Sequence, residues 1–283
     1  MFAGIEVVRR IEAAEASLTL EVSRAVRREG AVVRALGSGA GAWSPEGTPF
    51  DKVIGWGLGD DAEEDGALRA FERDVLERRG AVRMELATVG ALRHAEALCR
   101  RGYRVAGLEN VLGLPLGAGA PTPARPAAGG LAVRPAAPDE EEAWLRTVVA
   151  GFGEPDPTDP APPQALDDAL LSGVFRELGA ASGLRRYVAL AEGELVGGAT
   201  LRLSGGVAQL AGAATRAAFR RRGIQAALLS ARLADAAAEG CDLAVVTTEP
   251  GSRSQRNVQR QGFALLYGRL VLVLDRKGGA ARG

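Results

Sequence analysis

The second half of the chain alternates amphipathic segments with short, nearly continuous apolar runs. Residues 224–239 have the spacing of a long helix, and Gly240 follows at the position where a glycine commonly ends one. Residues 243–248 form an apolar run typical of a strand buried on both faces. With the strand-like run at 207–214, this pattern predicts a strand–helix–strand unit whose two strands are parallel.

The remaining pattern of the second half predicts a mixed α/β domain. Turn residues at Glu192-Gly193 and Ser204-Gly205-Gly206 separate three strand-like runs, which favours two hairpins. A proline-rich stretch at 154–163 is interpreted as a surface loop between two helices. The predicted elements, in chain order, are a strand at 131–134, helices at 139–149 and 167–178, strands at 186–191, 195–203 and 207–214, the helix at 224–239, the strand at 243–248, a short helix at 252–260, and one or two strands within 263–274.

An internal repeat relates the two halves of the chain. A shift of 160 residues places Gly80 on Gly240 and Thr88 on Thr248. Glycines and apolar positions stay in register over about 50 residues, although a chance match of two ordinary α/β segments is the alternative. The first half is therefore interpreted as the same fold shortened at its N-terminus, with residues 4–29 in the place of the second helix.

The clearest boundary between the halves is a segment rich in proline, glycine and alanine at 115–130, which is typical of an interdomain linker. We therefore expect a first domain at 1–114, a second at 131–276, and a flexible tail at 277–283.

Composition narrows the classes of function. Hydrophobic residues make up 47% of the chain and charged residues 25%, as in ordinary globular proteins, and the formal net charge is zero. We therefore expect neither a nucleic-acid nor a membrane partner, and a cytoplasmic location. His94 is the only histidine, and Cys99 and Cys241 are the only cysteines, so no metal site is expected.

The segment with the clearest chemistry joins the run at 207–214 to the helix at 224–239. Arg220, Arg221 and Arg222 precede Gly223, and the helix begins immediately after that glycine. Free amides and the dipole at a helix start favour anions, and a glycine lets a ligand approach the backbone. This combination predicts a site for an anion of pyrophosphate size, and a solvated arginine run is the alternative interpretation.

This segment resembles the cofactor-binding motif of the GNAT acetyltransferases, which reads Gln or Arg, two residues, Gly, one residue, then Gly or Ala. Arg220 and Gly223 match the motif, whereas Gln225 departs from it. The order of elements over residues 130–275, and Gly262-Phe263 near its end, resemble the same family. The resemblance implies two GNAT-like domains, each a mixed, mostly antiparallel sheet flanked by helices. It also implies acetyl-CoA as cosubstrate, held by Ala213, Ala214, Thr215, Arg220, Arg221, Arg222, Gly223, Ile224, Gln225 and Ala226.

The first half lacks this motif. The repeat places residues 60–65 opposite the arginine loop, and five of these six positions are acidic. Carboxylates at a helix start suit the helix dipole but repel a pyrophosphate. We therefore expect the first half to be a degenerate GNAT-like domain without CoA binding.

The catalytic residues are less clearly indicated. Many members of the family carry a Glu on the strand before the motif and a Tyr four residues before the Gly-Phe pair. Here the strand carries no acid, and the tyrosine position is Val258. The candidates that remain are Glu249 as a base and Ser254 and Tyr267 as proton donors. A turn Glu, a helix-start Ser and a strand-face Tyr are their structural alternatives.

The resemblance implies an acetyl-CoA-dependent N-acetyltransferase that acts on an amine of a small molecule or on an amino terminus. The alternatives are a catalytically impaired protein that binds acetyl-CoA or acts as a scaffold, and a module that binds a nucleotide at the same arginine loop. Expected partners are acetyl-CoA and an amine acceptor, with homodimer formation left open.

Overall fold

The computed structural model describes residues 4–59, 61–90, 92–117, 130–154 and 167–275. Most of the expected linker, most of the proline-rich loop and the expected tail lie outside these residues. The chain divides into two compact units, one made of residues 1–111 and 265–283 and the other of residues 112–264. We call them unit 1 and unit 2.

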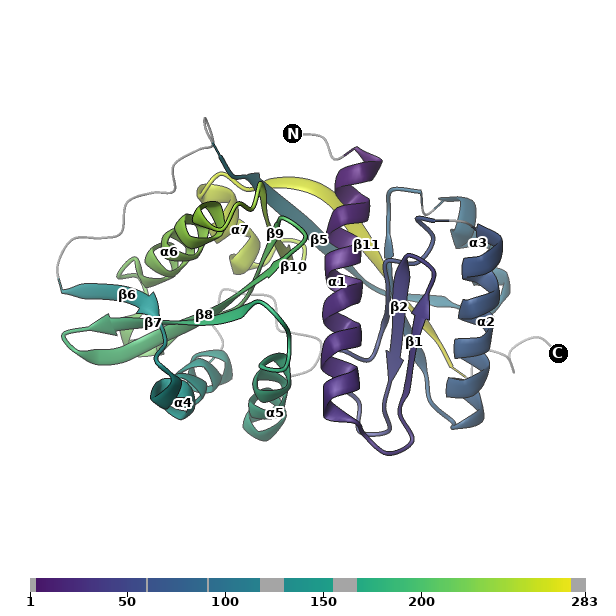
Figure 1. The fold of residues 1–283 in the computed structure, drawn as a ribbon, viewed down its shortest axis with the longest axis horizontal. Coiled ribbons are helices and arrows are strands. Elements are labelled where there is room, and N and C mark those ends of the chain that lie inside the picture. Colours follow the sequence, from purple (N-terminus) through teal and green to yellow (C-terminus); the bar gives the residue numbers. More distant parts are fainter. Residues whose placement is uncertain (1–3, 60, 91, 118–129, 155–166, 276–283) are drawn as a thin grey trace. The chain divides into compact units, whose positions relative to one another are not determined.

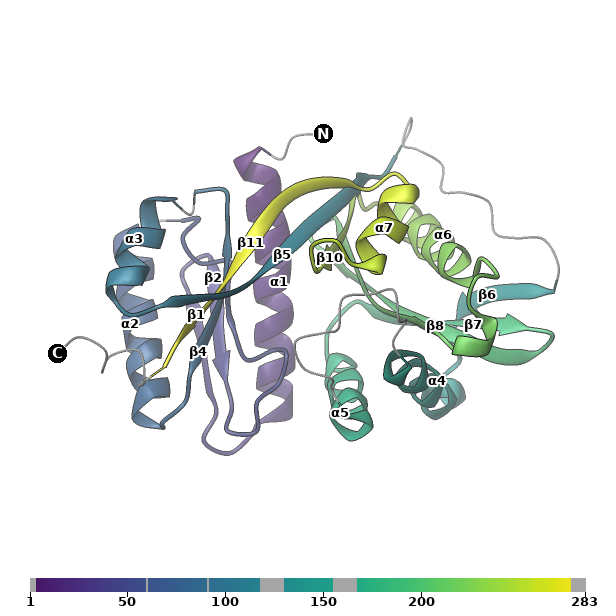
Figure 2. The same ribbon diagram turned by 180° about the vertical axis from the view of Figure 1, so that it is seen from behind.

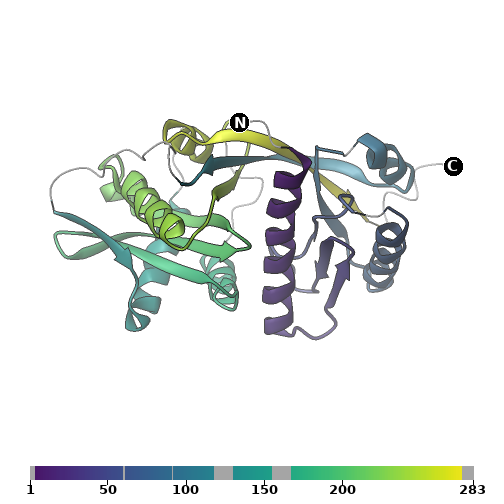
Figure 3. The same ribbon diagram turned by 45° about the horizontal axis from the view of Figure 1, so that its top comes forward.

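Unit 1 is a mixed sheet with helices on both faces. Strands β1, β2 and β3 are antiparallel neighbours, and β3 is parallel to β4. Figures 1 and 3 show α1 on one face of these strands and α2 and α3 on the other. The elements are α1 (Ile5–Val26), β1 (Val32–Leu36), β2 (Gly39–Trp43), β3 (Val53–Ile54), α2 (Asp61–Glu77), β4 (Val82–Ala87), α3 (Leu92–Arg100) and β5 (Arg104–Pro115).

Unit 2 has the same plan with two more elements at its beginning. Strands β6 to β9 are antiparallel neighbours, and β9 is parallel to β10. Figures 1 and 2 show α4 and α5 on one face and α6 and α7 on the other. The elements are β6 (Leu131–Pro135), η1 (Pro138–Glu140), α4 (Glu141–Gly153), α5 (Asp168–Leu178), β7 (Leu184–Ala191), β8 (Glu194–Ser204), β9 (Val207–Thr215), η2 (Ala217–Phe219), α6 (Ile224–Ala238), β10 (Leu243–Thr248) and α7 (Arg253–Arg260). The following strand, β11 (Ala264–Leu274), belongs to unit 1 from Leu265 onward.

Each predicted element of the second half is confirmed, as are the two hairpins and the parallel step. Glu192 and Gly193 both have positive φ, which matches the right-handed twist of a tight hairpin. The helix expected at 139–149 begins with a 3₁₀ turn at Pro138–Glu140 and extends to Gly153. Residues 4–29 contain a helix, α1, as the repeat predicts.

The two units exchange their last strands. In unit 1, β4 pairs with β11 from the end of the chain, and Leu272 and Leu274 join the core formed with α2. In unit 2, the neighbour of β10 is the end of β5, whose Leu112 and Leu114 are buried with α6. Residues 265–275 therefore group with unit 1, whereas the sequence placed them in the second domain. A repeat in sequence cannot distinguish the two pairings, because equivalent strands carry equivalent apolar patterns.

Candidate functional site

The connection from β9 to α6 places a glycine immediately before the helix. Gly223 has φ 78° and ψ 5°, a left-handed conformation that suits glycine and strains a β-branched residue. No side chain caps this end of α6. Within the part of the chain that the structure describes, the amides of Ile224, Gln225 and Ala226 have no hydrogen-bond partner. The start of α6 therefore offers free N–H groups and the positive end of a helix dipole.

Arg220 has a role in the loop that the sequence did not reveal. Its guanidinium donates to the carbonyl oxygens of Thr215 (3.3 Å), Gly151 (3.0 Å) and Glu154. The side chain thus ties the end of β9 and the last turn of α4 to the loop. Among the three arginines, Arg221 and Arg222 are the exposed ones, and the Arg222 guanidinium lies 5.1 Å from the centre of the Phe219 ring.

Gln225 occupies the motif position that is usually Gly or Ala, and its side chain points back toward β9. The Nε2 atom of Gln225 donates to Oγ1 of Thr215 over 3.1 Å. Thr215 is itself buried at the end of the strand. The larger residue is accommodated by this contact, and the amide of Gln225 remains without a partner among the described residues.

A β-bulge interrupts β9 just before the loop. Gly198 of β8 faces Ala214, and Thr200 of β8 faces Ala211. The two β9 residues Gly212 and Ala213 therefore lie opposite the one β8 residue that separates Gly198 from Thr200. Gly212 takes φ 57°, and a Cβ at this position would lie 2.6 Å from the Phe175 ring. A bulge re-aims backbone groups that the ladder would otherwise use, and it does so here in the stretch expected to hold the cofactor.

A buried arginine holds this bulge from the helix side. Arg232 of α6 is 3% exposed, and its guanidinium donates to the carbonyl oxygens of Thr200 (2.9 Å) and Leu228 (3.0 Å). Burial lowers the pKa of Arg232 to about 10. The side chain therefore connects the helix with the free amides to the bulged strand pair.

The strands β9 and β10 are paired over only part of their length. Their parallel register runs from Leu243–Val207 to Val245–Gln209, and both strands continue beyond it. Residues 210–215 of β9 and 246–248 of β10 therefore carry strand geometry without a ladder between them. We call this unpaired stretch between β9 and β10 the opening, defined by the end of the ladder at Val245. Unpaired strand backbone beside a helix start is where a ligand can add its own backbone-like groups to a sheet.

Two of the candidate catalytic residues lie beyond the end of β10. Glu249 is exposed, and its carbonyl oxygen accepts a hydrogen bond from the amide of Ser252. Ser254 is exposed in the first turn of α7, where Ser252, rather than Ser254, caps the helix by accepting from the amide of Gln255. Glu249 and Ser254 are thus close in sequence and both exposed, and neither side chain has a hydrogen-bond partner among the described residues.

The third candidate, Tyr267, lies in unit 1. It is buried, and its hydroxyl donates to Glu12 of α1 over 2.5 Å. Burial and the charge of Glu12 raise the pKa of Tyr267 far above its usual range. The structure brings Tyr267 together with Glu12 and Arg269, and not with Glu249 or Ser254, which belong to unit 2.

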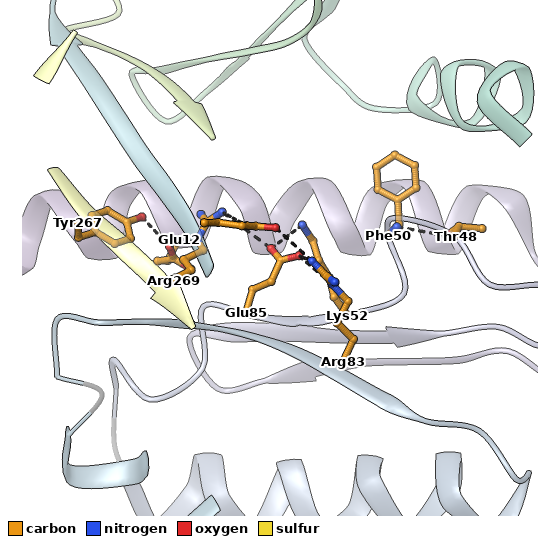
Figure 4. A network of polar contacts seen from close by, with 9 residues as sticks. Glu12, Thr48, Phe50, Lys52, Arg83, Glu85, Tyr267 and Arg269 are labelled. Carbon is orange, nitrogen blue, oxygen red and sulfur yellow. Dashed lines mark hydrogen bonds and ion pairs between the residues drawn. The ribbon is translucent and has the colours of Figure 1, made fainter. Parts of the chain in front are cut away.

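Tyr267 is one member of a buried charged cluster in unit 1, shown in Figure 4. Arg269 donates to Glu12 over 2.8 Å, and both side chains are 1% exposed. Lys52 donates to Glu85 over 2.9 Å, and the positive charges around Glu85 hold its pKa below the usual value although burial opposes this. We call Glu12, Lys52, Arg83, Glu85, Glu109, Tyr267 and Arg269 the unit 1 cluster. Its three carboxylates are balanced by three cationic side chains, and its most buried ion pair joins Glu12 to Arg269, whereas Arg83 is exposed.

The helix start of unit 1 that corresponds to the start of α6 carries an internal carboxylate. Glu64, in the first turn of α2, is buried and accepts hydrogen bonds from the amides of Ser38 (2.9 Å) and Gly57 (2.9 Å). An anion approaching this helix start would meet a negative charge already bonded to the neighbouring backbone amides.

Sequence reasoning missed Thr200, Phe175, Arg232 and Thr248. An arginine within the apolar face of the helix at 224–239 was a visible signal for Arg232. Thr248 was visible only as the repeat partner of Thr88. Within the described ranges, no group of three or more His, Cys, Asp or Glu side chains is placed to hold a metal ion, and no helix is long and apolar enough to cross a membrane.

Comparison with known proteins gives one family match. Residues 145–263 match the model described as Acetyltransferase (GNAT) family. This range includes the bulged β9, the arginine loop, α6, β10 and α7. No curated protein sequence matches the chain.

Solved structures are similar to the chain over much of its length. A GCN5-related N-acetyltransferase from Kribbella flavida has a TM-score of 0.62 and 22% identity, with 96% of this chain and 98% of that chain covered. A tandem GNAT protein from the clavulanic acid biosynthesis pathway has a TM-score of 0.57 and 12% identity, with 96% of each chain covered. A GCN5-related N-acetyltransferase from Sphaerobacter thermophilus has a TM-score of 0.55 and 17% identity, with 75% of this chain and 67% of that chain covered. These likenesses concern the fold.

Proposed function

Since residues 145–263 match the model of the GNAT acetyltransferase family, we propose that the protein transfers an acetyl group from acetyl-CoA to an amine of a small molecule or to an amino terminus. In this proposal unit 2 binds the cofactor. The observation that carries it is the start of α6, where three amides without partners among the described residues follow the left-handed Gly223. A pyrophosphate fits such a helix start because its oxygens accept from several N–H groups at once.

The bulged strand β9 supports the part of the proposed cofactor site that would hold the pantetheine arm. Ala213 and Ala214 belong to the part of β9 that has no ladder with β10, so their backbone groups are available to an extended pantetheine arm. The small side chains leave room for this approach. Arg220 supports the site indirectly, because its hydrogen bonds hold the loop against α4.

Acyl transfer also needs a neutral amine and a stabilised oxyanion. We propose Glu249 as the carboxylate that deprotonates the acceptor, directly or through water, because it is an exposed acid at the carboxyl end of β10. Ser254 is the neighbouring hydroxyl on α7. Tyr267 is left out of this proposal because its hydroxyl donates to Glu12 in unit 1.

Ligand-dependent stability tests the cofactor assignment. Thermal unfolding is measured with acetyl-CoA, CoA and ATP, since a ligand present at 100 times its Kd should add about 2.7 kcal/mol. Stabilisation by acetyl-CoA and CoA, and not by ATP, is the expected result. An amine panel with detection of released thiol then identifies the acceptor. Equal stabilisation by ATP would favour the nucleotide-binding alternative.

A second candidate function is a protein that binds acetyl-CoA without turning it over. The specific observation in its favour is that β9 carries no carboxylate, and that the position four residues before Gly262 and Phe263 on α7 is the buried Val258. CoA binding without thiol release over a broad amine panel would support this alternative.

For unit 1 we propose that the helix start at α2 does not bind CoA. The buried carboxylate of Glu64, held by the amides of Ser38 and Gly57, supports this view. The test titrates CoA into a variant whose unit 2 no longer binds it, because any binding that remains would then belong to unit 1. Adding Glu64→Gln to this variant shows whether the Glu64 charge is what prevents binding there.

A further inference from the structure

We propose that the hydroxyl of Thr248 donates a hydrogen bond to the sulfur of the acyl donor and stabilises the thiolate that leaves. This inference rests on the proposed function, because it needs an acyl-CoA beside β10. It goes beyond that function by assigning the leaving-group contact to a residue that the motif does not include.

The place of Thr248 in the strand brings it to the opening between β9 and β10. It is the last residue of β10, three positions beyond Val245, where the pairing with β9 ends. Side chains alternate along a strand, so Thr248 shares its face with Ala244 and Val246. Both of these pack on the core that contains Ile224 of α6 and Val258 of α7. Thr248 is therefore on the same side of the sheet as the helix whose start offers free amides.

The hydroxyl of Thr248 has no partner of its own. The residue is 6% exposed, and its Oγ1 atom has no hydrogen bond within the part of the chain that the structure describes. Buried hydroxyls are nearly always paired, because an unmade hydrogen bond in the interior is costly. A ligand group that enters the opening would supply the missing partner.

The repeat provides a comparison within the same chain. Thr88 lies one residue beyond the end of β4 and is exposed, and its Oγ1 accepts a hydrogen bond from the amide of Gly268 over 3.2 Å. The amide of Thr88 donates to the carbonyl oxygen of Gly268 over 2.8 Å. The threonine of unit 1 is thus satisfied by β11, whereas its counterpart in unit 2 is not. The difference follows the cofactor motif, which only unit 2 carries.

Other hydroxyls near this end of the strand fit the role less well. Ser254 is exposed to solvent, and Thr247 lies on the opposite face of β10 and is exposed. The α7 position where the family commonly has a tyrosine is Val258, which has no donor. Thr248 combines burial, the correct face and an unused hydroxyl.

The chemistry requires a donor, and not an acid that ionises. The amine nitrogen bonds to the thioester carbonyl carbon, and the C–S bond then breaks with its electron pair on sulfur. The proton that the amine loses passes to a base or to solvent. An aliphatic hydroxyl is much less acidic than a thiol, so Thr248 keeps its proton and stabilises the thiolate by hydrogen bonding.

The test measures the thiol pKa of bound CoA, from thiolate absorbance, in the whole protein and in three variants. Thr248→Val has the same shape without the hydroxyl, Thr248→Ser keeps the hydroxyl, and Thr88→Val is the matched control. Loss of the hydrogen bond should raise the bound-thiol pKa by about one unit in Thr248→Val, while Thr248→Ser and Thr88→Val stay near wild type. With an acceptor in hand, kcat of Thr248→Val should fall about tenfold at a similar KM for acetyl-CoA.

The stability of the ligand-free variants separates this role from a structural one. Thr248→Val should unfold no more easily than wild type, whereas Thr88→Val should unfold more easily because it loses the bond to Gly268. Bound CoA with the same thiol pKa in wild type and Thr248→Val would overturn the inference and leave the proposed function standing. Failure of the wild-type protein to bind CoA would overturn both. If Thr248→Val does not fold, Thr248→Ala is measured in its place.

Discussion

Tyr267 donates a hydrogen bond of 2.5 Å to Glu12, a residue 255 positions earlier in the chain. Arg269, two residues further along β11, donates to the same Glu12 carboxylate over 2.8 Å. Helix α1 and strand β11 are thereby joined inside unit 1. We therefore expect the stability of unit 1 to depend on β11.

Removing the hydroxyl in Tyr267→Phe should lower the free energy of unfolding by about 1.5–3 kcal/mol, because the lost hydrogen bond is to a buried charged group. Urea unfolding measures the change. Tyr187→Phe is the control, since its hydroxyl donates to the half-buried Asp235 in unit 2 and its loss should cost less. Equal losses in the two variants would contradict a special role for the contact with Glu12.

A chain that stops after Ala264 should fail to form a stable unit 1. It lacks Leu272 and Leu274 from the core, and it leaves Glu12 buried without Arg269. A chain that stops after Asp275 keeps all of these and is the matched control. Hydrogen exchange should show loss of protection in β4 and α2 in the shorter chain only. Retained protection there would mean that β11 is dispensable.

Replacing Gly223 by Val should weaken acetyl-CoA binding at least about tenfold, or ~1.4 kcal/mol, because valine strains the left-handed backbone and crowds the start of α6. Gly223→Asn separates backbone strain from crowding, since asparagine tolerates the left-handed conformation and adds only a side chain. Gln225→Gly should be tolerated, because it removes only the contact with Thr215. Calorimetry with acetyl-CoA gives the affinities, and unchanged binding by a folded Gly223→Val protein would contradict the cofactor site.

Glu249→Gln keeps the shape of the side chain and removes its charge. If Glu249 is the base, kcat should fall about 100-fold or more. If it only attracts a cationic acceptor, apparent KM should rise while kcat changes little. Steady-state kinetics across pH distinguishes the two results. Kinetics equal to wild type at every pH would remove Glu249 from the reaction.

The decrease of the unfolding free energy at acid pH should depend on Glu140. Hydrogen bonds from Arg134, and from the amide of Ala137, lower the pKa of Glu140 to about 2. Since this folded-state pKa is below the unfolded value of about 4.3, the stabilisation is complete above that pH and is lost as pH falls toward 2. Glu140→Gln should therefore show a shallower loss of unfolding free energy between about pH 4.3 and pH 2 in denaturant titrations. The same slope as wild type would contradict the assignment.

Local patterns in the sequence were sufficient for the elements of unit 2 and for the helix start. The position of Gly223 immediately before an apolar, alanine-rich segment predicted where the loop ends and α6 begins. This was possible because the few residues around a helix start decide its position. The hairpin turns at Glu192-Gly193 and at 204–206 were predictable for the same reason. The repeat also predicted helix α1 at the beginning of the chain.

Long-range contacts decided the rest. Arg220 was visible as part of an arginine run, but only the fold could show that its guanidinium binds the carbonyl of Gly151, 69 residues away. Tyr267 looked like a proton donor for unit 2, yet β11 carries it into unit 1 beside Glu12. Strands of similar apolar pattern can pair with either β4 or β10, and the choice depends on the sum of many contacts along both partners. Sequence by itself therefore determined the local conformations, and the tertiary structure determined that β11 pairs with β4 and that the end of β5 is the neighbour of β10.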